Sequence, residues 1–155
     1  MAIWCTDLAI DRWRLAEGLA RGEGLDAAPL ALIEETAHGP RIAAANAAAL
    51  AAGTAPPMRL TDARTLCPTL AVRSADAAGD LAFLENLALW AQRWGPWSAL
   101  DPPDGLLVDT SGVAHLFGGE RALIADVLSL LDKRGLAARA ALAPTAGAAW
   151  ALARY

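Results

Sequence analysis

Short apolar runs, separated by glycine and proline, divide the chain into segments of strand and helix length. Runs of β-branched and aliphatic residues bounded by turn formers are typical of buried strands. Strands are predicted at residues 2–5, 29–35, 40–46, 70–73, 105–111 and 136–143. The segment TAHG, between the second and third of these, predicts a turn that joins them.

Apolar residues at helical spacing lie between these runs. Asp11 is a plausible N-cap for a helix over 12–21, Asp80 begins a helix over 80–94, and Gly135 ends a helix over 120–134. Shorter helices are predicted at 46–53, at 61–67 and from residue 144 onward. The alternation of strands and helices predicts an α/β or α+β sheet layered with helices, with an irregular insertion between about residues 11 and 72.

Composition and charge narrow the class of protein. Of 155 residues, 55% are hydrophobic and 19% are charged, which is enough apolar material for a core. The net charge is -4, and Lys133 is the only lysine among 13 basic residues, so weak or no DNA binding by this chain is expected. No membrane span and no signal peptide are indicated, and the two cysteines lack metal-ligand spacing. We therefore expect a cytoplasmic protein with two buried thiols.

The segment SALDPPDGLLVDTSG raises the question of metal chemistry. Asp101, Asp104 and Asp109 surround a short β-like run, and acids beside a strand hold divalent metals in many enzymes. Asp104 and Asp109 are five residues apart and face opposite sides of a regular strand. The segment is a metal site, the remnant of one, or a turn followed by a strand.

Three stretches together resemble the Y-family of DNA polymerases, the lesion-bypass enzymes. RIAAANAAALAAGTAPPMRLTDARTLCPTLAV is similar to their fingers, and DGLLVDTSG to the palm strand that the family writes Asp-Glu-Ala-Tyr-Leu-Asp-Val-Thr. ALAPTAGAAWALAR occupies the place of the helix start Ile-Ser-x-Asn-Lys-x-Leu-Ala-Lys. The residues that fall on the family's fingers positions are Gly53, Met58, Ala63, Cys67 and Pro68.

The resemblance implies a domain organisation. Residues 1–10 would form the first palm strand, 11–72 a small helical and β fingers insertion, and 73–155 the rest of the palm, truncated before the thumb and little finger. The palm would be a ferredoxin-like mixed sheet with helices.

Further details are similar to one branch, the polymerase-like subunit of a bacterial damage-inducible mutagenesis complex. These details are ALDPPDGLLVDTSGVAHLFGGE together with GAAWALAR. The branch implies a role in the SOS response and translesion synthesis, as an adaptor that associates with the nucleoid on DNA damage. Its implied partners are the RecA-like ImuA protein and, through regions outside this fragment, an error-prone replicative-type polymerase and the sliding clamp.

The resemblance also indicates which catalytic groups are missing. The family holds two Mg²⁺ ions with an acid on the first strand and an Asp-Glu pair on the palm strand, and these positions fall on Asp7, Asp104 and Gly105. The glutamate is therefore lost, and the remaining acids are interpreted as vestigial.

The groups that bind the triphosphate are missing as well. The family's Tyr and Arg fall on Ala47 and Leu50, and its two lysines on Ala146 and Trp150. Because loss of one transition-state arginine costs on the order of 10³–10⁵ in rate, this pattern predicts a pseudoenzyme with no catalytic residue, metal or cofactor.

Two alternatives remain open. The chain could be an active Mg-dependent translesion nucleotidyltransferase that uses Asp7, Asp101 and Asp104 through an irregular turn. It could also be an unrelated metabolic α/β domain in which the motif matches arise by chance.

Overall fold

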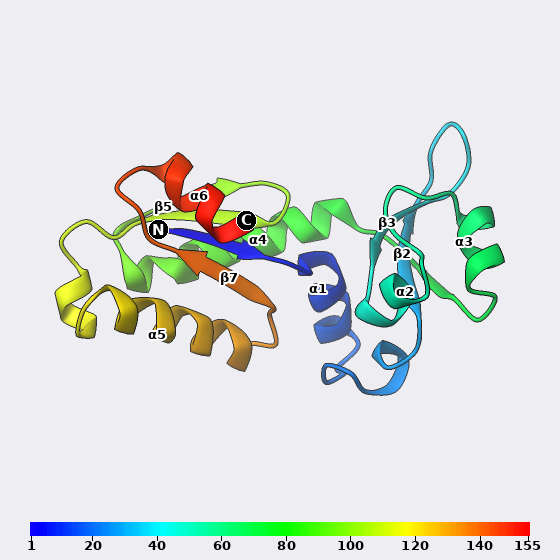
Figure 1. Ribbon diagram of the computed structural model, residues 1–155, viewed down its shortest axis with the longest axis horizontal. Helices are drawn as coiled ribbons and strands as arrows, with labels where there is room; N and C mark the ends of the chain where they lie inside the picture. Colours follow the sequence, from blue (N-terminus) through cyan, green and yellow to red (C-terminus); the bar gives the residue numbers. More distant parts are fainter. The chain divides into compact units, whose positions relative to one another are not determined.

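The computed structural model describes all residues, 1–155, and they form two compact units (Figure 1). The first unit consists of Met1–Leu8 and Ala78–Tyr155. The second unit is the insertion Ala9–Ala77.

A four-stranded sheet forms the centre of the first unit. Its strand order is β5 (Trp97–Asp101), β6 (Gly105–Asp109), β1 (Ala2–Cys5) and β7 (Ala138–Ala141). The predicted α/β class is confirmed with two corrections. Every pair in this sheet is antiparallel rather than mixed, and β5 was missed because its acids and prolines indicated only a turn.

Three helices cover the two faces of this sheet. Along β1, Ile3 and Cys5 point into the core formed with α4 (Ala77–Ala91) and α5 (Glu120–Lys133). Ala2 and Trp4 point to the opposite face, where α6 (Ala146–Arg154) packs. This division follows from the alternation of side chains along a strand, and Figure 1 shows α5 and α6 on opposite sides of the sheet.

The ends of these helices follow local signals in part. Arg134 is the C-cap of α5 and Gly135 follows with a positive φ of 78°, as predicted. Helix α4 begins at Ala77, before Asp80, and its last predicted turn is instead a 3-10 helix over Gln92–Trp94. A second 3-10 helix, Ala114–Phe117, occupies the segment predicted as a loop after β6.

The second unit contains a three-stranded sheet of order β3 (Arg41–Ala45), β2 (Leu30–Glu34) and β4 (Ala71–Ser74). Strands β2 and β3 form the predicted hairpin, while β2 and β4 are parallel, so the mixed sheet lies in this unit. The helices of the unit are α1 (Leu8–Ala16), α2 (Ala47–Ala51) and α3 (Leu60–Leu66), with a 3-10 helix at Gly24–Asp26.

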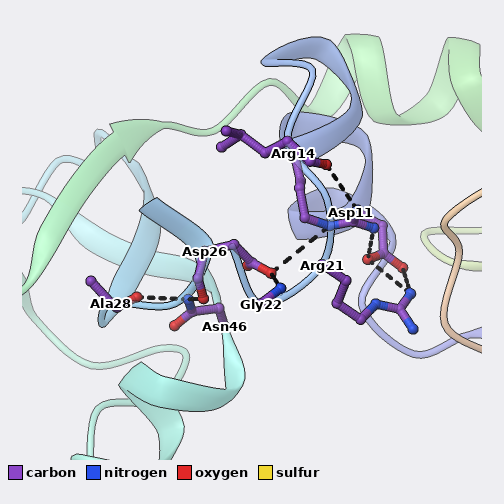
Figure 2. A network of polar contacts seen from close by, with 8 residues as sticks. Asp11, Arg14, Arg21, Gly22, Asp26, Ala28 and Asn46 are labelled. Atoms are coloured by element: carbon purple, nitrogen blue, oxygen red, sulfur yellow. Dashed lines mark hydrogen bonds and ion pairs between the residues drawn. The ribbon is translucent and has the colours of Figure 1, made fainter. Parts of the chain in front are cut away.

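The prediction that Asp11 is the N-cap of the first helix is wrong. Asp11 lies inside α1 and is 2% exposed, so it is not an N-cap. Its carboxylate accepts a hydrogen bond from Arg14 Nη2 at 2.9 Å and pairs with Arg21 Nη2 at 3.3 Å (Figure 2). A buried carboxylate needs such partners, and the distant Arg21 could not be anticipated from local sequence.

Asn46 joins three segments of the second unit. Its side chain accepts hydrogen bonds from the backbone amides of Leu30 and Ala49, and so caps α2. The same amide donates to the carbonyl oxygens of Asp26 and Ala28, at 3.0 and 2.9 Å (Figure 2). All four hydrogen-bonding capacities of this buried amide are therefore used.

Cys5 and Cys67 are free and buried, which confirms the predicted buried thiols. None of the helices combines the length and the apolar character that a membrane crossing requires.

Candidate functional site

The β5–β6 hairpin brings two of the candidate acids together. Asp101 is the last residue of β5 and is paired with Gly105, the first residue of β6. Asp104 lies in the turn between them, and its carbonyl oxygen accepts a hydrogen bond from the amide of Cys5 at 2.9 Å. Both acids are thereby fixed beside the end of β1.

A cation from the same chain lies between these acids. Nη2 of Arg154, on α6, donates to Oδ2 of Asp101 at 3.0 Å and to Oδ1 of Asp104 at 2.9 Å. The second carboxylate oxygen of Asp104 accepts the indole Nε1–H of Trp4 at 2.9 Å. The side chains of Arg154, Asp101 and Asp104 are 17%, 30% and 27% exposed, so this cluster is largely withdrawn from water.

Two indole rings hold the guanidinium in place. Cζ of Arg154 lies 5.2 Å from the ring centroid of Trp4 and 5.0 Å from that of Trp150, within the range of cation–π contacts. Partial burial works against the charged form, but the hydrogen bonds to Asp104 and Asp101 outweigh it, and the pKa of Arg154 is raised. Arg154 is therefore a permanent positive charge at this position.

A side chain at Gly105 would disturb this arrangement. A β carbon placed there would lie 2.7 Å from Oδ2 of Asp101 and 3.1 Å from Nη2 of Arg154. The backbone carbonyl oxygen of Asp101 would be 3.0 Å away as well, so a side chain at this position, including the glutamate that the resemblance leads us to expect there, would require Asp101 or Arg154 to move.

The other acids do not join the cluster. Asp7 is exposed between β1 and α1, and its carboxylate accepts a hydrogen bond from the hydroxyl of Thr6 at 3.0 Å. Asp109, at the far end of β6, accepts from the amide of Ser111 at 2.9 Å, and hydrogen bonds from Ser111 lower its pKa. No three His, Cys, Asp or Glu side chains in the chain are grouped so that they could hold a metal ion. The residues present do not fit the pair of Mg²⁺ ions that nucleotidyl transfer requires.

Three of the four predicted triphosphate positions carry side chains without polar atoms. Ala47 and Leu50 lie one turn apart on α2 in the second unit, and both are exposed. Ala146 is the exposed first residue of α6. The indole of Trp150 stacks on Arg154.

An open groove of about 340 Å³ lies elsewhere on the first unit. Its lining includes Trp97, Asp109, Pro144 and Ala146, but not Asp101, Asp104 or Arg154. The groove therefore does not rebuild a catalytic centre around the acid pair.

The sequence alone did not identify Arg154 and Trp4 as members of the cluster around Asp101 and Asp104. The spacing along the last helix could have indicated Arg154. It follows Ala146 and Trp150 at steps of four residues, and so lies on the same side of α6 as these two candidate positions. Its pairing with two acids more than 50 residues away depends on tertiary structure.

Comparison with known proteins adds three findings. A model of the impB/mucB/samB family (IMS) matches residues 15–154. Protein ImuB of two Caulobacter vibrioides strains, NA1000 and CB 15, is 48% identical over 103 residues, which is 66% of this chain but 22% of each relative. The chain thus spans well under half the length of the curated relatives that it matches.

Solved polymerase structures share the fold. The chain is similar to DinB from Sulfolobus solfataricus, with a TM-score of 0.75, 15% identity, and coverage of 99% of this chain and 45% of that one. A post-insertion binary complex of Dbh DNA polymerase gives a TM-score of 0.81 at 15% identity, with coverage of 99% and 44%. These likenesses confirm the predicted polymerase-type fold. The match to the impB/mucB/samB family over residues 15–154 contradicts the alternative of an unrelated domain with chance motif matches.

Proposed function

The chain belongs to the impB/mucB/samB family, and on that premise we propose that it is the catalytically inactive part of a polymerase-like adaptor in damage-induced translesion synthesis. The similarity to Protein ImuB supports a polymerase-like role in DNA repair. We propose two things in addition: that the protein does not catalyse nucleotidyl transfer, and that it acts as an adaptor.

The arrangement of Arg154 is the observation that most supports inactivity. Metal-assisted phosphoryl transfer needs free carboxylates around two ions about 3.5–4 Å apart. Here Asp101 and Asp104 both accept from one guanidinium, and a third acid in place of Gly105 would have to move these side chains. A metal ion would have to displace the guanidinium of Arg154, which is part of the same chain.

The adaptor role follows from what such a subunit could still do. A polymerase fold that has lost its chemistry keeps surfaces on which other proteins can assemble. We infer that the complete protein bridges the RecA-like ImuA protein, an error-prone replicative-type polymerase and the sliding clamp. Contacts to the last two would involve regions outside these 155 residues.

A primer-extension assay tests the inactivity. The full-length protein that contains this chain is incubated with primed template, nucleoside triphosphates and Mg²⁺ or Mn²⁺, beside an active Y-family polymerase. We expect no extension above the protein-free control, and no change on Asp104→Ala. Extension that disappears with Asp104→Ala would contradict the proposal and support an active Mg-dependent nucleotidyltransferase.

A binding assay tests the adaptor role separately. The full-length protein is immobilised and each of the three purified partners is passed over it. Retention of the RecA-like protein and at least one of the other two is expected. If none is retained, the bridging role is wrong whatever the polymerase assay shows.

A further inference from the structure

Two arginines of the first unit share one tryptophan ring on the face of the sheet that α4 and α5 cover. Cζ of Arg93, in the 3-10 helix after α4, lies 4.4 Å from the ring centroid of Trp90. Cζ of Arg134, the C-cap of α5, lies 4.2 Å from the same centroid. The end of α4 and the end of α5 are thus joined by one indole that holds two guanidinium groups.

The ring is itself held rigidly. Trp90 makes an edge-to-face contact with Trp94, whose centroid is 4.8 Å away and which is 1% exposed. Nε1 of Trp94 donates to Oδ2 of Asp126 at 2.8 Å, which fixes the second indole to α5. The two arginines therefore rest on a platform that is part of the core.

Neither guanidinium has an acidic partner. Arg93 and Arg134 take part in no ion pair and no side-chain hydrogen bond, whereas Arg154 in the same unit contacts two carboxylates. Stacking occupies the face of a guanidinium and leaves its N–H edge available. Both side chains are exposed, so their donors face solvent in a largely fixed position.

An apolar residue lies next to this pair. Leu89 is 66% exposed and directly precedes Trp90 in α4, so it lies close to the indole that the two arginines share. Tryptophan and arginine are the residue types most enriched in binding hot spots, and fixing them in advance lowers the entropy cost of binding.

We propose that Leu89, Trp90, Arg93 and Arg134 form a docking surface for an acidic segment of a partner protein. Carboxylates of the segment would accept from the two guanidiniums, and an apolar side chain would cover Leu89. The proposal rests on the adaptor role proposed above and names the chemistry of one partner. A protein segment fits better than nucleic acid, because the surface offers only two cations and has an exposed leucine next to Trp90 that an apolar side chain of a protein can cover.

The test uses the ¹⁵N-labelled 155-residue chain and two synthetic peptides. One peptide alternates Asp and Leu, and the other has Asn in place of every Asp. The acidic peptide is expected to shift the indole N–H signal of Trp90, assigned with Trp90→Phe, and the amides of Leu89 and Arg93. The Asn peptide should bind at least about tenfold more weakly, because charge-assisted hydrogen bonds are roughly twice as strong as neutral ones.

Variants identify the surface. Arg93→Gln with Arg134→Gln should weaken the acidic peptide about tenfold, while Arg121→Gln, an exposed arginine of the same unit, should leave its affinity unchanged. Arg93→Lys with Arg134→Lys keeps both charges and should restore only part of the affinity, since an ammonium lacks the planar stacked form.

Three results would overturn the inference. They are no binding of the acidic peptide, equal binding by the double glutamine variant, and tighter binding of a single-stranded oligonucleotide of equal charge than of the peptide. The circular dichroism spectrum and the melting temperature of each variant must match those of the unaltered chain, and the lysine variant replaces the glutamine variant if the latter unfolds. A positive primer-extension assay would contradict the proposed inactivity without affecting this binding result.

Discussion

Replacing Arg154 by methionine should destabilise the first unit measurably. The substitution keeps the apolar stem of the side chain and removes the guanidinium that contacts Asp101 and Asp104 at 3.0 and 2.9 Å. Two carboxylates would then remain close together without a counterion, and Trp4 and Trp150 would lose their stacking partner.

The size of the effect follows from the exposure of these groups. A hydrogen bond to a charged group contributes about 1.5–3 kcal/mol, so two such bonds set an upper bound of about 6 kcal/mol. The three side chains are 17–30% exposed, and water can therefore replace part of what is lost. We expect the free energy of unfolding to fall by about 2–3 kcal/mol, and the melting temperature by about 5–10 °C.

Urea and thermal unfolding of the chain, followed by circular dichroism, give both quantities. Arg121→Met is the matched control, because Arg121 is exposed on α5 and makes no ion pair, and it should change stability by less than about 0.5 kcal/mol. Equal losses in the two variants would refute the reasoning, since the Arg154 cluster would then contribute nothing beyond an exposed arginine.

Further predictions concern the remaining parts of both units. Gly105→Ala should lower the free energy of unfolding by about 1–3 kcal/mol in urea titrations, because the new methyl group would meet Asp101. A neutral result would show that Asp101 and Arg154 move aside without cost. Asn46→Ala should cost about 2–4 kcal/mol in the same assay, since four backbone groups lose their partner, whereas Asn86→Ala on the exposed face of α4 should cost less than about 1 kcal/mol. Treatment with EDTA should leave the melting temperature unchanged, and a drop would indicate a bound divalent ion. NMR titration should find the pKa of Asp109 below its ordinary value, and Ser111→Ala should raise this pKa. The pKa of Asp109 is lower in the folded state than in the unfolded state. The small stabilisation is therefore present above the unfolded-state pKa and is lost as the pH falls through the folded-state pKa. If the titration midpoint of Asp109 does not change in Ser111→Ala, the Ser111 hydroxyl plays no part in lowering the pKa of Asp109.

The sequence predicted elements whose ends are set by local chemistry. The strands around TAHG follow Pro29 and Pro40, and Gly135 adopts the positive φ expected after a helix. The helix expected over residues 46–53 is observed as α2, which Asn46 caps. These signals work because the residues concerned act on their own backbone neighbours.

Features that depend on distant contacts were missed. Asp11 resembled an N-cap, but the fold buries it beside Arg14 and Arg21. Strand β5 exists because it pairs with β6 across the Pro102–Pro103 turn, and no apolar alternation marked it in advance.

In the candidate site, too, the local features could be predicted and the distant contacts could not. The resemblance placed Asp104 and Gly105 at the family's acidic positions, and the structure puts both in the hairpin as a turn residue and a strand end. The ion pairs that neutralise Asp104 could not be anticipated, because they require α6 to cross the face of the sheet that carries Trp4.

Asp101, Gly105 and Arg154 also limit which substitutions the β5–β6 hairpin can accept. A longer side chain at Gly105 would meet Asp101 and Arg154, whereas loss of the arginine would leave two carboxylates close together without a counterion. Because contacting residues are not additive in their effects, the consequence of changing any one of these residues depends on the other two. The three positions are therefore energetically coupled, and we expect a tolerated change at one of them to require a matching change at another.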